Sequence, residues 1–119
     1  MKRYCMINEV KKENLNDYVN LHNNPWKEML TAIREAGAAN ELIYMYGNLA
    51  IIFIECEDIN EFLKNLGERD VGKQWFEKVS PFLSVSQSVD EEGKVRSEAG
   101  YLEKVFDLNQ QLDDVLQQF

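Results

Sequence analysis

The stretch Glu41–Cys56, ELIYMYGNLAIIFIEC, decides the fold. Two apolar runs, Glu41–Tyr46 and Leu49–Cys56, flank the pair Gly47-Asn48. A Gly-Asn pair between apolar runs is typical of a two-residue β-hairpin turn. The sequence therefore predicts two antiparallel strands that pair with each other.

The second of these strands is apolar on both of its faces. Side chains alternate along a strand, so one face would carry Leu49, Ile51 and Phe53, and the other Ala50, Ile52 and Ile54. Both faces must then be covered. In a chain of 119 residues the helices can cover only one face. We therefore expect the other face to meet a second subunit, which predicts a homodimer.

The segments on either side of the hairpin complete a simple order of elements. Strands are predicted at Arg3–Val10 and Tyr101–Leu108, and helices at Leu15–His22, Pro25–Ala36, Ile59–Leu66 and Asp70–Val79. The order β-α-β-β-α-β is that of a ferredoxin-like α+β sandwich, with one antiparallel sheet and helices on one face. Two such sheets that face each other would form a dimeric α/β barrel.

The chain is predicted to be a single domain, residues 1–119, with two appendages. Ser84–Gly100 is polar, without periodicity, and is expected to be a long exposed loop. Asn109–Phe119 has apolar residues at helical spacing and is expected to be a short amphipathic tail helix. This tail could pack on its own domain or on a partner.

Composition excludes several classes of function. A formal net charge of −8 disfavours binding to nucleic acid or to an anionic membrane. Cys5 and Cys56 lie within apolar runs, which indicates buried free thiols in a reducing compartment. The N-terminus lacks the apolar run of a signal peptide, and Leu49–Ile54 is too short to span a bilayer. The expected location is the cytoplasm.

The segment Tyr18–Trp26, YVNLHNNPW, is the strongest candidate for a functional site because it contains the single His of the chain. Tyr18 and His22 are four residues apart and share one face of a helix. We expect Asn24 to cap a second helix that starts at Pro25. His22 would then lie in the last turn of the first helix, where the helix dipole favours the imidazolium form. In the simpler interpretation, His22 is structural and Trp26 belongs to the core.

The remaining motifs favour acid/base chemistry without a metal or a cofactor. The sequence contains no cluster of His, Cys and carboxylates at metal spacing, no glycine-rich nucleotide loop and no nucleophile elbow. Tyr18, Trp26 and Trp75 are suited to stacking on the apolar face of a sugar, and Asn40 and Glu41 to binding its hydroxyl groups.

Four motifs together resemble the L-rhamnose mutarotase family. They are Tyr18-x-x-x-His22-Asn23-x-Pro25-Trp26, Gly37-Ala38-x-Asn40-x-x-Ile43-Tyr44, Asp70-Val71-x-x-x-Trp75 and Glu103-x-Val105-Phe106. The resemblance spans nearly the whole chain. It implies a dimeric ferredoxin-like barrel that interconverts the α and β anomers of L-rhamnose, or of a related 6-deoxyhexose, without a cofactor.

The resemblance also implies roles for individual residues. His22 resembles the proton donor of the family, Tyr18 its substrate-contacting tyrosine, and Trp75 the first of two aromatic residues that line the substrate. The sequence departs from the pattern at Phe76, where the family often has Trp, and at Glu41, where it has Tyr. The exchange at Glu41 makes L-fucose a contender beside L-rhamnose.

These observations lead to a mechanism and to two alternatives. Mutarotation needs one proton delivered to the ring oxygen and one removed from the anomeric hydroxyl. His22 is predicted to deliver the first, and Tyr18, Glu41 or a water molecule to handle the second. The alternatives are a non-catalytic sugar-binding or interaction module on the same fold, and a cofactor-free oxygenase, which the polar pair Asn40-Glu41 disfavours.

Overall fold

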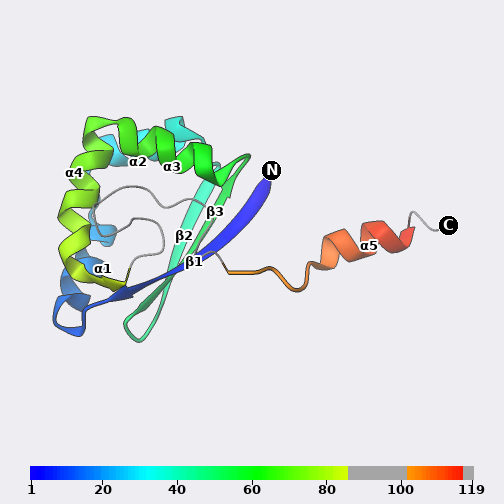
Figure 1. The fold of residues 1–119 in the computed structure, drawn as a ribbon, viewed down its shortest axis with the longest axis horizontal. Helices are drawn as coiled ribbons and strands as arrows, with labels where there is room; N and C mark the ends of the chain where they lie inside the picture. The colour runs from blue at the N-terminus through cyan, green and yellow to red at the C-terminus, as the bar shows by residue number, and fades with distance from the viewer. Residues whose placement is uncertain (86–101, 117–119) are drawn as a thin grey trace.

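The computed structural model describes residues 1–85 and 102–116, and it has one sheet with helices packed on one face (Figure 1). The strands are β1 (Lys2–Val10), β2 (Asn40–Tyr46), β3 (Leu49–Cys56) and β4 (Leu83–Val85). The helices are α1 (Leu15–Asn23), α2 (Lys27–Ala36), α3 (Ile59–Glu68), α4 (Asp70–Val79) and α5 (Leu108–Leu116), with short 3₁₀ turns at Lys12–Asn14 (η1) and Ser80–Phe82 (η2).

The sheet has four antiparallel strands in the order β2-β3-β1-β4. Strands β2 and β3 form the predicted hairpin, in which Tyr46 pairs with Leu49. Gly47 at the turn has a φ of 59°, a conformation that glycine adopts without steric cost. Strand β1 then pairs with β3, so that Met6 lies opposite Ile52. The predicted ferredoxin-like α+β fold is confirmed.

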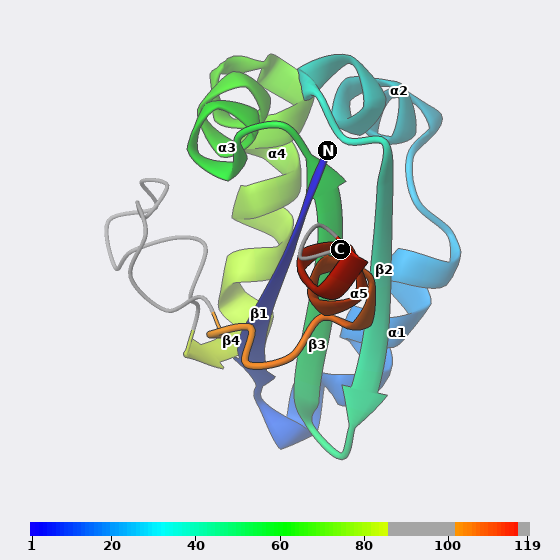
Figure 2. The same cartoon turned by 90° about the vertical axis from the view of Figure 1, so that its right-hand side faces the viewer.

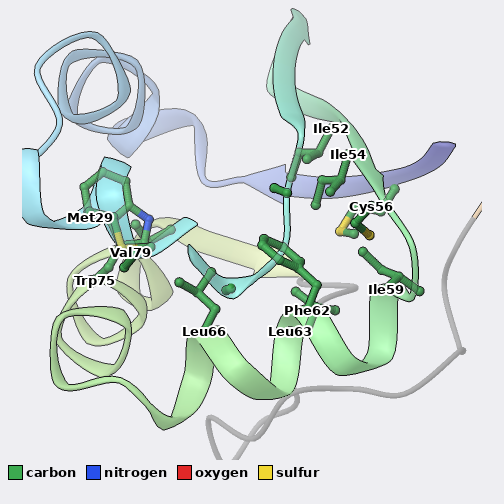
Figure 3. Close-up of a cluster of buried hydrophobic side chains, with 14 of the residues drawn as sticks. Met29, Ile52, Ile54, Cys56, Ile59, Phe62, Leu63, Leu66, Trp75 and Val79 are labelled. Atoms are coloured by element: carbon green, nitrogen blue, oxygen red, sulfur yellow. The ribbon is translucent and has the colours of Figure 1, made fainter. Parts of the chain in front are cut away.

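The two faces of the sheet have different surroundings. On the face turned toward the helices, here called the inner face, Ala50, Ile52 and Ile54 of β3 are buried. Figure 3 shows two of these side chains directed at Phe62 and Leu63 of α3. This layer is the hydrophobic core, and its burial supplies the main driving force that holds helices and sheet together.

The opposite side of the sheet, here called the open face, is not covered by any described helix (Figures 1 and 2). Arg3 and Glu55 form an ion pair at one end of this face, near Asn40, and Glu9 lies at the other end. Its remaining outward-pointing residues are mostly apolar, namely Cys5, Ile7, Leu42, Tyr44, Tyr46, Leu49, Ile51 and Phe53. Tyr44 and Phe53 pack edge to face with ring centroids 5.9 Å apart, and both remain exposed. The predicted division of β3 into two apolar faces is therefore confirmed.

Side-chain caps and glycine define several helix ends as the sequence predicts. Asp58 accepts hydrogen bonds from the backbone N–H groups of Asn60 and Glu61 and so caps α3. Gly37 ends α2 with a φ of 128°. The predicted start of α2 is wrong, however, because Asn24 caps the end of α1 instead.

The reason lies in the hydrogen bonds of Asn24. Both its side-chain amide and its backbone N–H donate to the carbonyl oxygen of Asn20. Pro25 disfavours a helical conformation at the residue before it, and α2 starts two residues later, at Lys27. The helical segment is therefore interrupted as predicted, but the connection between α1 and α2 is longer than predicted.

The C-terminal third differs most from the sequence-based prediction. The fourth strand is Leu83–Val85, which overlaps the start of the predicted loop Ser84–Gly100, and the rest of that loop from residue 86 lies outside the described residues. This strand pairs with the end of β1 at Glu9 and Val10. Residues 102–107 form no strand, and the backbone N–H of Leu102 donates a hydrogen bond to the carbonyl oxygen of Cys5. The predicted tail helix is present as α5.

No helix within residues 1–85 and 102–116 is both long and apolar enough to cross a bilayer.

Candidate active site

A cavity of about 330 Å³ lies between the inner face of the sheet and helices α1 to α4 of the same chain. This volume is at the lower end of the range for small-molecule sites. Its polar lining comes from separate parts of the chain and includes Asn8 on β1, His22 and Asn23 on α1, Glu41 on β2 and Ser80 at η2. Apolar side chains of the sheet and of helices α2, α3 and α4 complete the wall. The predicted residues Tyr18, His22, Glu41, Trp75 and Phe76 all line this one cavity.

His22 lies in the last turn of α1, as predicted, and its ring is held in a fixed orientation. Its Nδ1 is 2.8 Å from the carbonyl oxygen of Tyr18. A carbonyl oxygen only accepts hydrogen bonds, so Nδ1 carries the proton of the neutral ring and Nε2 is the acceptor nitrogen. A neutral His22 is therefore suited to taking a proton from a bound molecule at Nε2.

The predicted charge state of His22 is wrong. Burial lowers the pKa of His22 below its usual value of 6.5, and the hydrogen bond to Tyr18 opposes this shift only in part. Loss of water around the ring disfavours the imidazolium. This loss outweighs the favourable end of a helix that has only nine residues.

Glu41 lies on the inner face of β2, where it pairs in register with Ile54. Its side chain is partly buried, and the loss of solvation beside the cavity raises the pKa of the carboxyl group to about 7. The charge of Glu41 also raises the pKa of Tyr18, so the two side chains interact across the cavity. Near neutral pH a substantial fraction of Glu41 is protonated and can donate a hydrogen bond.

Aromatic rings surround His22 on two sides. The ring of Tyr18 is tilted over the imidazole with centroids 4.2 Å apart, and Trp75 of α4 presents its edge at 5.3 Å. Phe76, next to Trp75, also lines the cavity, so adjacent positions on α4 both contribute to it. Trp26 packs edge-on against Trp75 at 5.2 Å and is not among the lining residues, so it supports Trp75 from behind.

Asn8 is a lining residue that the sequence analysis missed. It is 5% exposed and points to the inner face between Met6 and Val10, which are fully buried. A polar residue at an inward position of an otherwise apolar strand is the signal that could have identified it, because a buried amide is costly unless it is hydrogen-bonded, and such residues are therefore uncommon in a core. Within the described residues, no group of three or more His, Cys, Asp or Glu side chains is placed to hold a metal ion.

The family model for L-rhamnose mutarotase matches residues 3–108 of the chain. The chain belongs to the L-rhamnose mutarotase family. Two relatives with this name are similar over 88 residues, one from Oceanobacillus iheyensis at 27% identity and one from Lactiplantibacillus plantarum at 26%. The first alignment covers 72% of this chain and 84% of the relative, and the second covers 73% and 85%.

Solved structures support the fold that this membership implies. An L-rhamnose mutarotase from Formosa agariphila superposes with a TM-score of 0.68 at 17% identity, covering 90% of this chain and 98% of that one. A protein from an uncultured marine organism is described as dimeric and ferredoxin-like, and it superposes with a TM-score of 0.51 at 12% identity. That superposition covers 71% of this chain and 86% of the other. At these identities both structures establish the fold alone.

Membership in the L-rhamnose mutarotase family places the chain among isomerases that act on carbohydrate anomers. The resemblance inferred from the sequence motifs is therefore confirmed. The roles of His22 and of the lining residues are not tested by these comparisons and stay predictions.

Proposed function

We propose that this chain interconverts the α and β anomers of L-rhamnose, or of a related 6-deoxyhexose such as L-fucose, by acid/base catalysis without a cofactor. The observation that carries the proposal is one cavity in which a neutral imidazole and a carboxyl group with a raised pKa are enclosed by aromatic rings. A proton acceptor and a proton donor are the two groups that mutarotation requires.

The reaction opens the pyranose ring and closes it on the other side of C1. In the proposed opening step, Nε2 of His22 takes the proton of the anomeric hydroxyl, and the carboxyl group of Glu41 gives a proton to the ring oxygen. The bond between C1 and the ring oxygen breaks as the C1 carbonyl forms. After rotation about the C1–C2 bond, both protons move back and the ring closes. His22 then donates its proton to the C1 oxygen in the closing step, so this proposal reverses the sequence-based prediction that His22 gives a proton to the ring oxygen.

The aromatic lining supports a sugar as the substrate. The faces of a pyranose carry C–H groups that pack well on aromatic rings, and the cavity offers Tyr18, Trp75 and Phe76 for this contact. Glu41 stands where the family pattern has Tyr, and a carboxyl group accepts more hydrogen bonds than a phenol. This difference is the reason to keep L-fucose as a candidate substrate beside L-rhamnose. Anomer-exchange rates measured on a panel of 6-deoxy and ordinary hexoses would show which sugar is preferred.

The test replaces His22 with Ala and follows anomer exchange by saturation-difference NMR. The rate above the uncatalysed background should fall by about 10²–10⁴-fold, because positioned proton transfer contributes that much. Asn16→Ala, an exposed site on the same helix, is the matched control and should exchange at the wild-type rate. Exchange by His22→Ala at the wild-type rate would contradict the proposed role.

The same measurement separates an enzyme from a non-catalytic sugar-binding module. Both would change the fluorescence of Trp75 when sugar binds, because Trp75 lines the cavity. Only an enzyme would also accelerate anomer exchange. A fluorescence response with exchange at the background rate would favour the binding module.

We also propose that the chain forms a homodimer through the open face, in the arrangement of a dimeric α/β barrel. The apolar open face supports this, since exposed apolar patches of this kind mark interfaces. A dimeric ferredoxin-like relative in structure offers a precedent. Sedimentation analysis at several protein concentrations would show a dimer, whereas a monomer at all concentrations would contradict the proposal. A cytoplasmic location and the absence of nucleic-acid or membrane partners stay predictions from the sequence.

A further inference from the structure

A hollow of about 600 Å³ lies beside the cavity, between α2 and the edge strand β2. Helix α2 and the start of β2 occupy the same end of the molecule (Figures 1 and 2). Leu30, Ile33 and Glu41 line both spaces, so the hollow and the cavity adjoin each other. The polar side chains that line the hollow alone are Thr31, Arg34, Glu35 and Asn40. A ligand in the cavity can therefore extend past Glu41 into the hollow.

Two side chains of the hollow have hydrogen-bond donors that the fold does not use. Arg34 is exposed, and no carboxylate within residues 1–85 and 102–116 forms an ion pair with it. The adjacent Glu35 is instead paired with Arg69, whose Nη1 lies 2.6 Å from its Oε2. The side-chain oxygen of Asn40 accepts a hydrogen bond from the N–H of Glu41 over 2.9 Å, which leaves the two N–H donors of its amide for another acceptor. The hollow therefore suits a ligand rich in oxygen acceptors, such as a sugar.

The proposed mechanism determines which part of a bound sugar faces the hollow. His22 takes the proton of the hydroxyl group on C1, and Glu41 gives a proton to the ring oxygen, which lies between C1 and C5. Glu41 borders the hollow and His22 does not, so the C5 side of the ring faces the hollow. A substituent on O4, at the carbon next to C5, therefore points toward the hollow. A substituent on O2 lies on the opposite side of C1 from the ring oxygen and points away from it.

We propose that the hollow binds a second sugar ring, attached to O4 of the 6-deoxyhexose whose anomeric centre lies between His22 and Glu41. Arg34 and Asn40 donate hydrogen bonds to the hydroxyl groups of this second ring. The cavity, at the low end of the range for small-molecule sites, suits one pyranose ring, and the hollow adds room for another. The inference rests on the proposed function and extends its substrate class from free monosaccharides to 4-linked disaccharides with a free reducing end.

Anomer exchange with three sugars tests the extended substrate class. The wild-type protein is supplied with L-rhamnose, with 4-O-β-D-glucopyranosyl-L-rhamnose or with the 2-O-linked isomer. The value of kcat/KM should be at least about tenfold higher for the 4-linked than for the 2-linked disaccharide, because only the former reaches the donors of the hollow. Catalysed exchange of L-rhamnose without this preference would overturn the inference and leave the proposed function intact. No catalysis with any of the three sugars would mean that the proposed function is wrong, and the inference with it.

A variant of Arg34 tests whether the hollow itself holds the second ring. Arg34→Ala should raise KM for the 4-linked disaccharide about tenfold, because a hydrogen bond from a charged donor is lost, and should leave KM for L-rhamnose unchanged. Lys27→Ala removes an exposed cation from the same helix outside the hollow and should change neither value. An equal rise in KM for both sugars would mean that Arg34 acts through the fold. An unchanged KM for the disaccharide would mean that the second ring does not contact Arg34; both results overturn the proposal.

Discussion

At the scale of single residues, burial sets the charge of both titratable groups in the cavity. Loss of water lowers the pKa of His22 and raises that of Glu41, so both groups favour their neutral forms. A neutral imidazole accepts a proton and a neutral carboxyl group donates one. The two pKa shifts therefore prepare a complementary pair for proton transfer near neutral pH.

The pH dependence of catalysis follows from these two shifts. The rate should fall as the pH rises through about 7, because Glu41 loses the proton that it donates. It should also fall at acidic pH, below the lowered pKa of His22, because the ring is then protonated and cannot accept. Anomer exchange measured by NMR between pH 5 and 9, with the uncatalysed rate subtracted, should give a bell-shaped profile. An enzymatic rate that stays constant from pH 6 to 9 would rule out Glu41 as the donor.

Glu41→Gln should make the folded protein more stable at high pH. The pKa of Glu41 is raised from 4.5 to about 7 in the fold, so the native state holds a proton that the unfolded chain releases. Native stability therefore declines as the pH rises from 4.5 through 7, by about 3 kcal/mol in total. Urea unfolding at pH 4 and pH 8 should show that the advantage of Glu41→Gln grows with pH. A pH-independent difference between Glu41→Gln and the wild type would contradict the explanation.

The sequence was sufficient to select His22, Tyr18 and Glu41 because rare residue types and motif spacing single them out. It could not decide the charge of His22, because the sequence shows the end of the helix but not the rings that exclude water from the imidazole. It also missed Asn8, whose importance depends on the cavity that other segments build around it.

At the scale of elements, the close contact between α3 and α4 fixes the position of Trp75. A Cβ atom added at Gly72 would lie only 2.0 Å from the backbone carbonyl oxygen of Leu66. Gly→Ala within a helix normally stabilises it by about 0.5–1 kcal/mol. Here the opposite sign is expected, with Gly72→Ala destabilising by at least about 2 kcal/mol, because backbone atoms of α3 must move.

Chemical denaturation followed by Trp fluorescence measures this effect. The nearby exposed substitution Gln74→Ala should change the free energy of unfolding by no more than about 0.5 kcal/mol. Because α4 carries Trp75 into the cavity, Gly72→Ala should also weaken sugar binding. A Gly72→Ala protein as stable as the wild type would show that α3 and α4 can move apart without lowering the free energy of unfolding.

The elements themselves differ in how well sequence patterns predict them. The hairpin, α3 and α5 have local signals, namely Gly47-Asn48, the Asp58 cap and a helical apolar period, and these predictions are confirmed. The three-residue strand β4 has no such signal, since its position depends on the free edge of β1 at Glu9 and Val10. The predicted strand Tyr101–Leu108 is wrong over its described part, since residues 102–107 have no regular structure and Leu108 begins α5.

At the scale of the whole molecule, the proposed homodimer depends on the open face. Phe53 lies at its centre, opposite Cys5 and Leu42 in register and edge-on to Tyr44. A carboxylate at this position would be desolvated twice in a symmetric dimer, once on each copy, and each unpaired buried charge is costly. Phe53→Asp should therefore yield a monomer at concentrations where the wild type is a dimer, with an unchanged circular dichroism spectrum because the side chain is already 41% exposed in one chain.

Sedimentation velocity across a concentration series distinguishes the two states. Lys64→Asp, an exposed site on the helix side of the molecule, introduces the same carboxylate away from the open face and should leave the dimer intact. The cavity lies within one chain, between the inner face and the helices, so a folded Phe53→Asp monomer should keep His22 and Glu41 in place. If Phe53→Asp remained a dimer with the wild-type Kd, the interface would have to lie elsewhere on the surface, and the open face would be free for another partner.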